Sequence, residues 1–123
     1  MSKKILIIEG SPTACGIIKD ILEGEGYEVF VAENGEDGVK RAEQEKPDLV
    51  ITDTLLPGID GFEACRQIRE IQGSTTPKII VMTGSVDAVD AVKARKAGAD
   101  DYCVKTNNFS HLIEAIENLF KTG

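Results

Sequence analysis

The chain contains no long apolar run. Only four apolar residues separate Lys4 from Glu9 near the amino end, which is too few for the core of a signal peptide. No other part of the 123 residues approaches the roughly 20 apolar residues that a membrane-spanning helix needs. We therefore expect a cytoplasmic protein with no membrane partner.

Positive charge is also in short supply. Lysine and arginine total 14, against 21 aspartate and glutamate residues, which gives a net charge of −7. This balance works against binding to nucleic acid or to an anionic membrane, because both depend on an excess of basic side chains. We expect proteins or cations as partners, and no nucleic acid.

Paired cysteines and clustered histidines are absent as well. The three cysteines, Cys15, Cys65 and Cys103, are odd in number, lack C-x-x-C spacing and lie inside apolar patterns. Reduced core thiols fit this pattern better than a disulfide or a zinc site. The single histidine, His111, lies near the start of the last expected helix, where we expect it to face solvent.

What the chain does contain is a five-fold alternation of short β-type runs and longer stretches with helical spacing. The β-type runs are residues 4–9, 27–32, 49–53, 78–83 and 101–104. Strand followed by helix, five times over, predicts an α/β fold in which helices cover both faces of a five-stranded parallel sheet. At this length we expect one domain, residues 1–123, in a doubly wound three-layer sandwich.

Two of the expected helices carry clear boundary signals. Ser11 and Pro12 supply an N-cap and a proline at the first helical position. Gly24 and Gly26 then end the apolar stripe of this helix. The last helix repeats the apolar spacing over residues 109–120.

Polar residues collect at the carboxyl ends of the expected strands. Glu9, Asp53 and Thr83 end the first, third and fourth strands, and Lys105 follows the fifth. A doubly wound sheet brings such strand ends to one crevice. An aspartate can attack phosphorus there, while a divalent cation, a lysine and a hydroxyl stabilise the transferring oxygens. The pattern indicates phosphoryl transfer, although a lone aspartate at a strand end more often caps a turn.

Several segments together resemble the receiver domain of two-component response regulators, over essentially the full chain. These segments are residues 5–9 (ILIIE), 53–63 (DTLLPGIDGFE), 80–84 (IVMTG), 97–102 (AGADDY) and 104–105 (VK). The resemblance implies a flavodoxin-like (βα)5 fold with strand order 2-1-3-4-5. It also implies a phosphorelay protein that signals by binding a partner and is not an enzyme beyond self-phosphorylation and slow autodephosphorylation.

The resemblance also implies a role for particular residues. Asp53 would accept a phosphoryl group from a histidine kinase or phosphotransfer protein. Thr83 and Lys105 would contact the phosphoryl oxygens, and Tyr102 would be a switch whose position follows Thr83. An output protein would bind the face formed by the fourth helix, the fifth strand and the fifth helix.

The chain departs from the receiver pattern at the expected metal site. The resemblance implies that Mg²⁺ is held by Glu9, Asp53 and the backbone carbonyl of Leu55. Receivers usually have a second acid directly after the first, whereas this chain has Gly10. We expect the missing carboxylate to weaken Mg²⁺ binding roughly tenfold or more, since about 1.4 kcal/mol corresponds to a decade in affinity.

A second departure is Thr106, where receivers usually have a proline after a cis peptide bond. A non-proline cis bond costs about 2.5 to 4 kcal/mol. The Lys105–Thr106 bond is therefore either trans with a displaced loop or a rare non-proline cis bond.

Two interpretations remain open within the family. Retention of Asp53, Thr83 and Lys105 favours a phosphorylation-dependent receiver over a degenerate receiver that acts as a phosphorylation-independent binding module. Outside the family, an enzyme of the haloacid-dehalogenase type requires a second acid two residues after the aspartate, where this chain has Leu55. A flavin carrier requires a phosphate-binding loop after the first strand, where Glu9 would repel the phosphate.

Overall fold

The computed structural model describes residues 2–72, 77–84, 88–105 and 109–122. Strands and helices alternate along them, as the sequence predicts. The elements are β1 (Lys4–Ile8), α1 (Pro12–Gly24), β2 (Glu28–Ala32), α2 (Gly35–Glu45), β3 (Leu49–Asp53), α3 (Gly61–Gln72), β4 (Lys78–Thr83), α4 (Ala88–Lys96), β5 (Asp101–Val104) and α5 (Ser110–Thr122). Within these described ranges, no helix combines the length and apolar character needed to cross a membrane.

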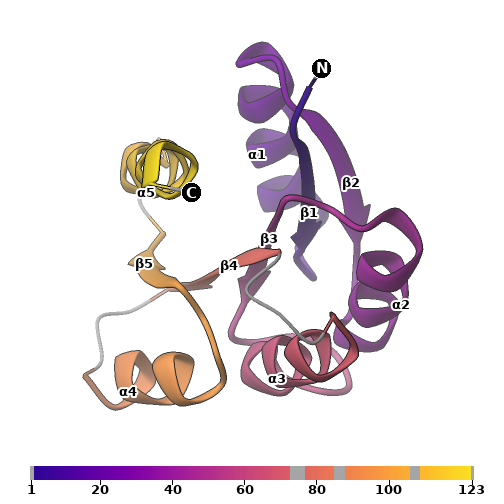
Figure 1. Ribbon diagram of the computed structural model, residues 1–123, viewed down its shortest axis with the longest axis vertical. Coiled ribbons are helices and arrows are strands. Elements are labelled where there is room, and N and C mark those ends of the chain that lie inside the picture. Colours follow the sequence, from indigo (N-terminus) through magenta and orange to yellow (C-terminus); the bar gives the residue numbers. More distant parts are fainter. Residues whose placement is uncertain (1, 73–76, 85–87, 106–108, 123) are drawn as a thin grey trace.

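The five strands form one parallel sheet in the order β2-β1-β3-β4-β5, which confirms the predicted fold class. Helices α1 and α5 cover one face of the sheet, and α2, α3 and α4 cover the other (Figure 1). Because helices lie on both faces, the inner strands are buried on both sides and their sequences are almost wholly apolar. Because the strands are parallel, the carboxyl ends of β1, β3 and β4 meet at one edge of the sheet.

Alternate residues of β1 enter two separate cores. Ile5 and Ile7 pack with residues of α1 and α5, whereas Leu6 and Ile8 pack with residues of α2 and α3. Cys65 and Cys103 are buried in these cores and all three cysteines are free. The predicted core position is therefore confirmed for these two, while Cys15 is only partly buried.

Three element boundaries differ from the sequence prediction. Glu9 lies beyond β1, although its amide still donates to the carbonyl of Ala32 at 3.0 Å. Tyr27 precedes β2 because its amide is bound to the carbonyl of Leu22, at 3.1 Å. Phe109 precedes α5 and has a left-handed backbone with φ of 56°. The apolar pattern along the sequence shows none of these three ends.

An arginine of α3 joins the start of β4 to the start of β5. Arg69 Nε donates to the carbonyl of Gly98 at 2.9 Å, and its Nη1 donates to the carbonyl of Pro77 at 2.5 Å. Its Nη2 pairs with Asp100, whose carboxylate also accepts the amide of Ile79 at 2.8 Å. This cluster holds the amino ends of β4 and β5 together, at the end of the sheet opposite the predicted functional residues.

We expect Arg69→Met to lower the free energy of unfolding by about 2 to 3 kcal/mol, because it leaves Asp100 and two backbone carbonyls without their shared donor. Arg66→Met is the matched control on the same helix. Arg66 is half exposed and pairs only with Glu63 and Glu70 in the part of the chain that the structure describes, so we expect little change. Urea unfolding of both variants decides the point, and equal losses would contradict this assignment.

Candidate functional site

The residues predicted at the strand ends come together at the carboxyl edge of the sheet. Asp53 ends the central strand β3, and Glu9 directly follows β1 on one side of it. Lys105 follows β5, and its amide donates to the carbonyl of Thr83 at 2.7 Å. Thr83 itself ends β4 and is only 3% exposed.

The side chain of Lys105 bridges the two carboxylates. Its Nζ lies 2.8 Å from Asp53 Oδ2 and 3.1 Å from both carboxylate oxygens of Glu9. Asp53 is 8% exposed and Glu9 is 2% exposed. Burial of two like charges is costly, so the ammonium group is what allows both carboxylates to lie here.

The pKa values of this cluster follow from burial and from the bridge. Burial raises the pKa of Glu9, as do the hydrogen bond and charge of Asp53, and Lys105 only partly opposes them. Burial alone would lower the pKa of Lys105, but its hydrogen bonds and charge interactions with the two carboxylates raise that pKa overall. Lys105 is consequently held as a cation at neutral pH.

The loop after β3 holds Asp53 by its backbone. The amide of Leu55 donates to Asp53 Oδ1 at 3.3 Å, and the amide of Gly61 donates to the carbonyl of Thr54 at 3.1 Å. A Cβ atom at position 61 would lie 1.9 Å from the carbonyl oxygen of Asp53. Only glycine fits there, and the loop can therefore close tightly behind the aspartate.

An open hollow of about 570 Å³ lies over this cluster. Its lining combines the charged side chains with an apolar wall from the loop after β3. The lining residues are Glu9, Gly10, Ser11, Asp53, Leu55, Leu56, Pro57, Asp60 and Lys105. Leu55 is 83% exposed at the rim, and the hollow extends down to the largely buried Asp53.

The donor set fits Mg²⁺ only in part. Glu9 Oε2 is buried and accepts no hydrogen bond from the residues that the structure describes, but Lys105 Nζ lies 3.1 Å from it, so a cation would have to share this hard oxygen with the ammonium group. Asp53 and the carbonyl of Leu55 could add further oxygens. However, the described ranges contain no group of three or more Asp, Glu, His or Cys side chains able to hold a metal ion. Gly10 contributes no carboxylate to make up the number.

Gly10 also shapes the packing of the site. A Cβ atom at this position would lie 3.2 Å from Cδ of Pro57 and 3.6 Å from the carbonyl oxygen of Glu33. The ring of Pro57 therefore packs directly against the glycine. A side chain here would press on Pro57 by a few tenths of an ångström.

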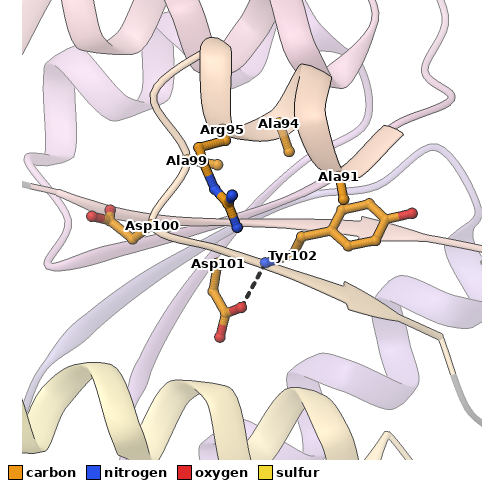
Figure 2. Close-up of a pocket in the computed structure, with 7 residues that line it drawn as sticks. All are labelled: Ala91, Ala94, Arg95, Ala99, Asp100, Asp101 and Tyr102. Carbon is orange, nitrogen blue, oxygen red and sulfur yellow. Dashed lines mark hydrogen bonds between the residues drawn. The ribbon is translucent and has the colours of Figure 1, made fainter. Parts of the chain in front are cut away.

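Tyr102 lies apart from this hollow. It lines a second pocket, of about 200 Å³, between α4 and β5, together with Ala91, Ala94, Arg95, Ala99, Asp100 and Asp101 (Figure 2). Its amide donates to Asp101 Oδ1 at 2.8 Å, and the ring extends toward Ala91. The switch role of Tyr102 stays a prediction.

Two further expectations have different outcomes. His111 is exposed, as predicted. Thr106 lies outside the described residues, so the conformation of the Lys105–Thr106 bond stays a prediction.

Two positions, Ser11 and Gly61, support the site in ways that the sequence does not predict. The sequence predicts Ser11 only as a helix cap, which is confirmed because Ser11 Oγ accepts the amide of Ala14 at 3.3 Å. The amide of Ser11 also donates to Glu9 Oε1 at 3.3 Å. Gly61 begins α3, where glycine weakens a helix, and this cost was a signal that the backbone comes close to another group there.

Comparisons with known proteins agree with this geometry. The family model described as the response regulator receiver domain matches residues 5–117. Protein PilH of Pseudomonas aeruginosa is 38% identical over 113 residues, which cover 92% of this chain and 93% of PilH. The alkaline phosphatase synthesis transcriptional regulatory protein PhoP of Bacillus subtilis is 40% identical over 105 residues, which cover 85% of this chain but only 43% of PhoP.

Solved structures show the same likeness. A CheY-like response regulator receiver domain protein from Methanospirillum hungatei superposes with a TM-score of 0.91 at 31% identity, over 99% of this chain and 96% of that one. The response regulator TrrA from Thermotoga maritima, solved in complex with Mg²⁺ and BeF, has a TM-score of 0.84 at 37% identity, over 95% of this chain and 98% of that one.

We expect Gly10→Asp to tighten Mg²⁺ binding roughly tenfold or more, because it returns a carboxylate to the rim of the hollow. Without metal, repulsion from Glu9 and Asp53 should lower the melting temperature, and Mg²⁺ should restore it by mass action. Gly10→Asn is the matched control, since it presses on Pro57 equally but adds no charge. Melting curves over a Mg²⁺ titration measure both effects, and wild-type affinity equal to that of Gly10→Asp would show that Glu9 already replaces the missing ligand.

Proposed function

Because the chain belongs to the receiver-domain family of two-component response regulators, we propose that Asp53 accepts a phosphoryl group from a histidine kinase or phosphotransfer protein. The observation that supports this most is the carboxylate of Asp53 at the end of the central strand, with Lys105 Nζ 2.8 Å away. A carboxylate oxygen would form the new bond to phosphorus as the phosphorus–nitrogen bond of the donor phosphohistidine breaks. The electron pair of that bond returns to the imidazole, which takes up a proton.

The neighbouring residues would stabilise the transferred group. The ammonium of Lys105 would offset charge on one phosphoryl oxygen, and the hydroxyl of Thr83 would donate to another. Mg²⁺, when bound by Glu9, Asp53 and the carbonyl of Leu55, would offset charge on the transferring oxygens. We propose that this binding is weak, since only the carboxylates of Glu9 and Asp53 meet at Lys105 and Gly10 adds none. Self-phosphorylation and slow autodephosphorylation would be the only chemistry.

The output would pass through the face formed by α4, β5 and α5. The three alanines beside Tyr102 leave a pocket of about 200 Å³, so its ring has room to change position when Thr83 moves toward a phosphoryl group. A groove of about 580 Å³ along β5 and α5, with His111 at its edge, adjoins this pocket. We propose that an output protein binds here, in the cytoplasm, with neither nucleic acid nor membrane as a direct partner.

One observation favours a second candidate, a degenerate receiver that binds its partner without phosphorylation. Lys105 already pairs with both Glu9 and Asp53, so part of the charge that a cation would offset is offset without one. The two candidates differ in whether Asp53 can be modified at all.

We expect intact-protein mass spectrometry to show one added phosphoryl group on the wild type after treatment with acetyl phosphate or a histidine kinase. Asp53→Ala should abolish the added mass, because it removes the attacking oxygen. Asp60→Asn is the control, since Asp60 lines the same hollow but should not carry the group. Parallel samples with Mg²⁺ and with chelator measure the metal dependence. If neither acetyl phosphate nor a panel of kinases modifies the wild type, the degenerate receiver is the better account.

A further inference from the structure

The first turn of α2 contacts the tip of the loop that follows Asp53. Glu36 Oε1 lies 3.5 Å from the amide nitrogen of Ile59, which donates to it. Both carboxylate oxygens of Glu36 also lie over Gly58, because a Cβ atom added there would be 2.5 Å from each of them. Gly58 has φ of 77°, so this backbone both requires glycine and makes room for the carboxylate.

Close packing at two glycines joins α2 both to the loop tip and to β1. A Cβ atom at Gly35 would lie 2.4 Å from Cγ1 of Ile59, and one at Gly38 would lie 2.4 Å from Cδ1 of Ile8. Two glycines of α2 thus allow close approach to the loop tip and to the last residue of β1, directly before Glu9. The amino half of α2 therefore packs against both segments that carry the site carboxylates.

The loop connects its tip at Gly58 and Ile59 to Asp53 through Pro57 and Leu55. Its far end is fixed by Gly61 against the carbonyl of Asp53, and Pro57 packs on Gly10. Between these points, the amide of Leu55 donates to Asp53 Oδ1 at 3.3 Å. Only Leu56, Pro57 and Gly58 separate Leu55 from Ile59, so we expect a displaced tip to shift Leu55 relative to Asp53.

We infer that Glu36 is a positioning residue for phosphoryl acceptance at Asp53: it holds the loop tip and, through the loop, the backbone of Leu55. This inference rests on the proposed function. A purely structural role differs from it in a measurable way. Glu36 lies in the first turn of α2, where its charge stabilises the helix dipole, and that effect is lost equally in Glu36→Gln and Glu36→Ala. Glutamine keeps an oxygen that can accept the amide of Ile59, whereas alanine does not.

The first test uses backbone amide NMR of the unphosphorylated protein. In Glu36→Ala, the amide of Ile59 should exchange faster with solvent and the amide resonance of Leu55 should shift, because its contact with Asp53 changes. Glu36→Gln should keep both amides close to the wild type, as should Glu43→Ala, an exposed control on the same helix. An unchanged Leu55 resonance in Glu36→Ala would overturn the inference.

The second test measures the rate at which acetyl phosphate modifies Asp53, at one fixed donor concentration. Glu36→Ala should slow the reaction roughly threefold to tenfold, the range expected from loss of one hydrogen bond, and Glu36→Gln should restore it to within about twofold. Equal rates in Glu36→Ala and the wild type, or equal losses in Glu36→Gln and Glu36→Ala, would refute the positioning role. A wild type that takes no phosphoryl group would overturn the proposed function, and the amide measurements would still decide whether Glu36 holds Leu55.

Discussion

The contacts of Lys105 with Asp53 and Glu9 are the interaction on which the rest of the site depends. Two carboxylates this close and this buried repel each other and lose hydration. A cation supplied from the end of β5 offsets both costs and joins three strands across the sheet. Attachment of a phosphoryl group to Asp53 would change the charge that Lys105 faces, since Lys105 Nζ lies 2.8 Å from Asp53 Oδ2.

Close backbone approaches at glycines determine where Asp53 lies. Gly61 abuts the carbonyl of Asp53, and Gly35 abuts Ile59, with no room for a side chain in either case. Such contacts have little freedom to relax, since folded interiors are densely packed. The loop after β3 is thereby fixed at its base and at its tip, while Leu55 between them stays exposed.

The sequence predicts most of the fold because the buried strands are apolar runs that end at polar residues. For the same reason, the sequence alone predicts that Asp53 and Lys105 lie at one edge of the sheet. It places Tyr27 and Phe109 in the wrong elements, because a hydrogen bond to α1 and a left-handed backbone override the local pattern. The sequence does not predict the role of Glu36. Its contact with Ile59 in the loop after β3 spans 23 residues, and a contact at that separation does not show in the spacing of apolar residues.

The most direct test of the lysine bridge is a carbon-13 NMR titration of the Glu9 carboxyl group in the metal-free wild type and in Lys105→Met. Burial and Asp53 hold the pKa of Glu9 above its ordinary value of 4.5, and Lys105 opposes them. The account predicts a raised pKa in the wild type and a still higher pKa once the ammonium is removed. The same Glu9 pKa in both proteins would show that Lys105 does not stabilise the buried carboxylates, and would contradict the account.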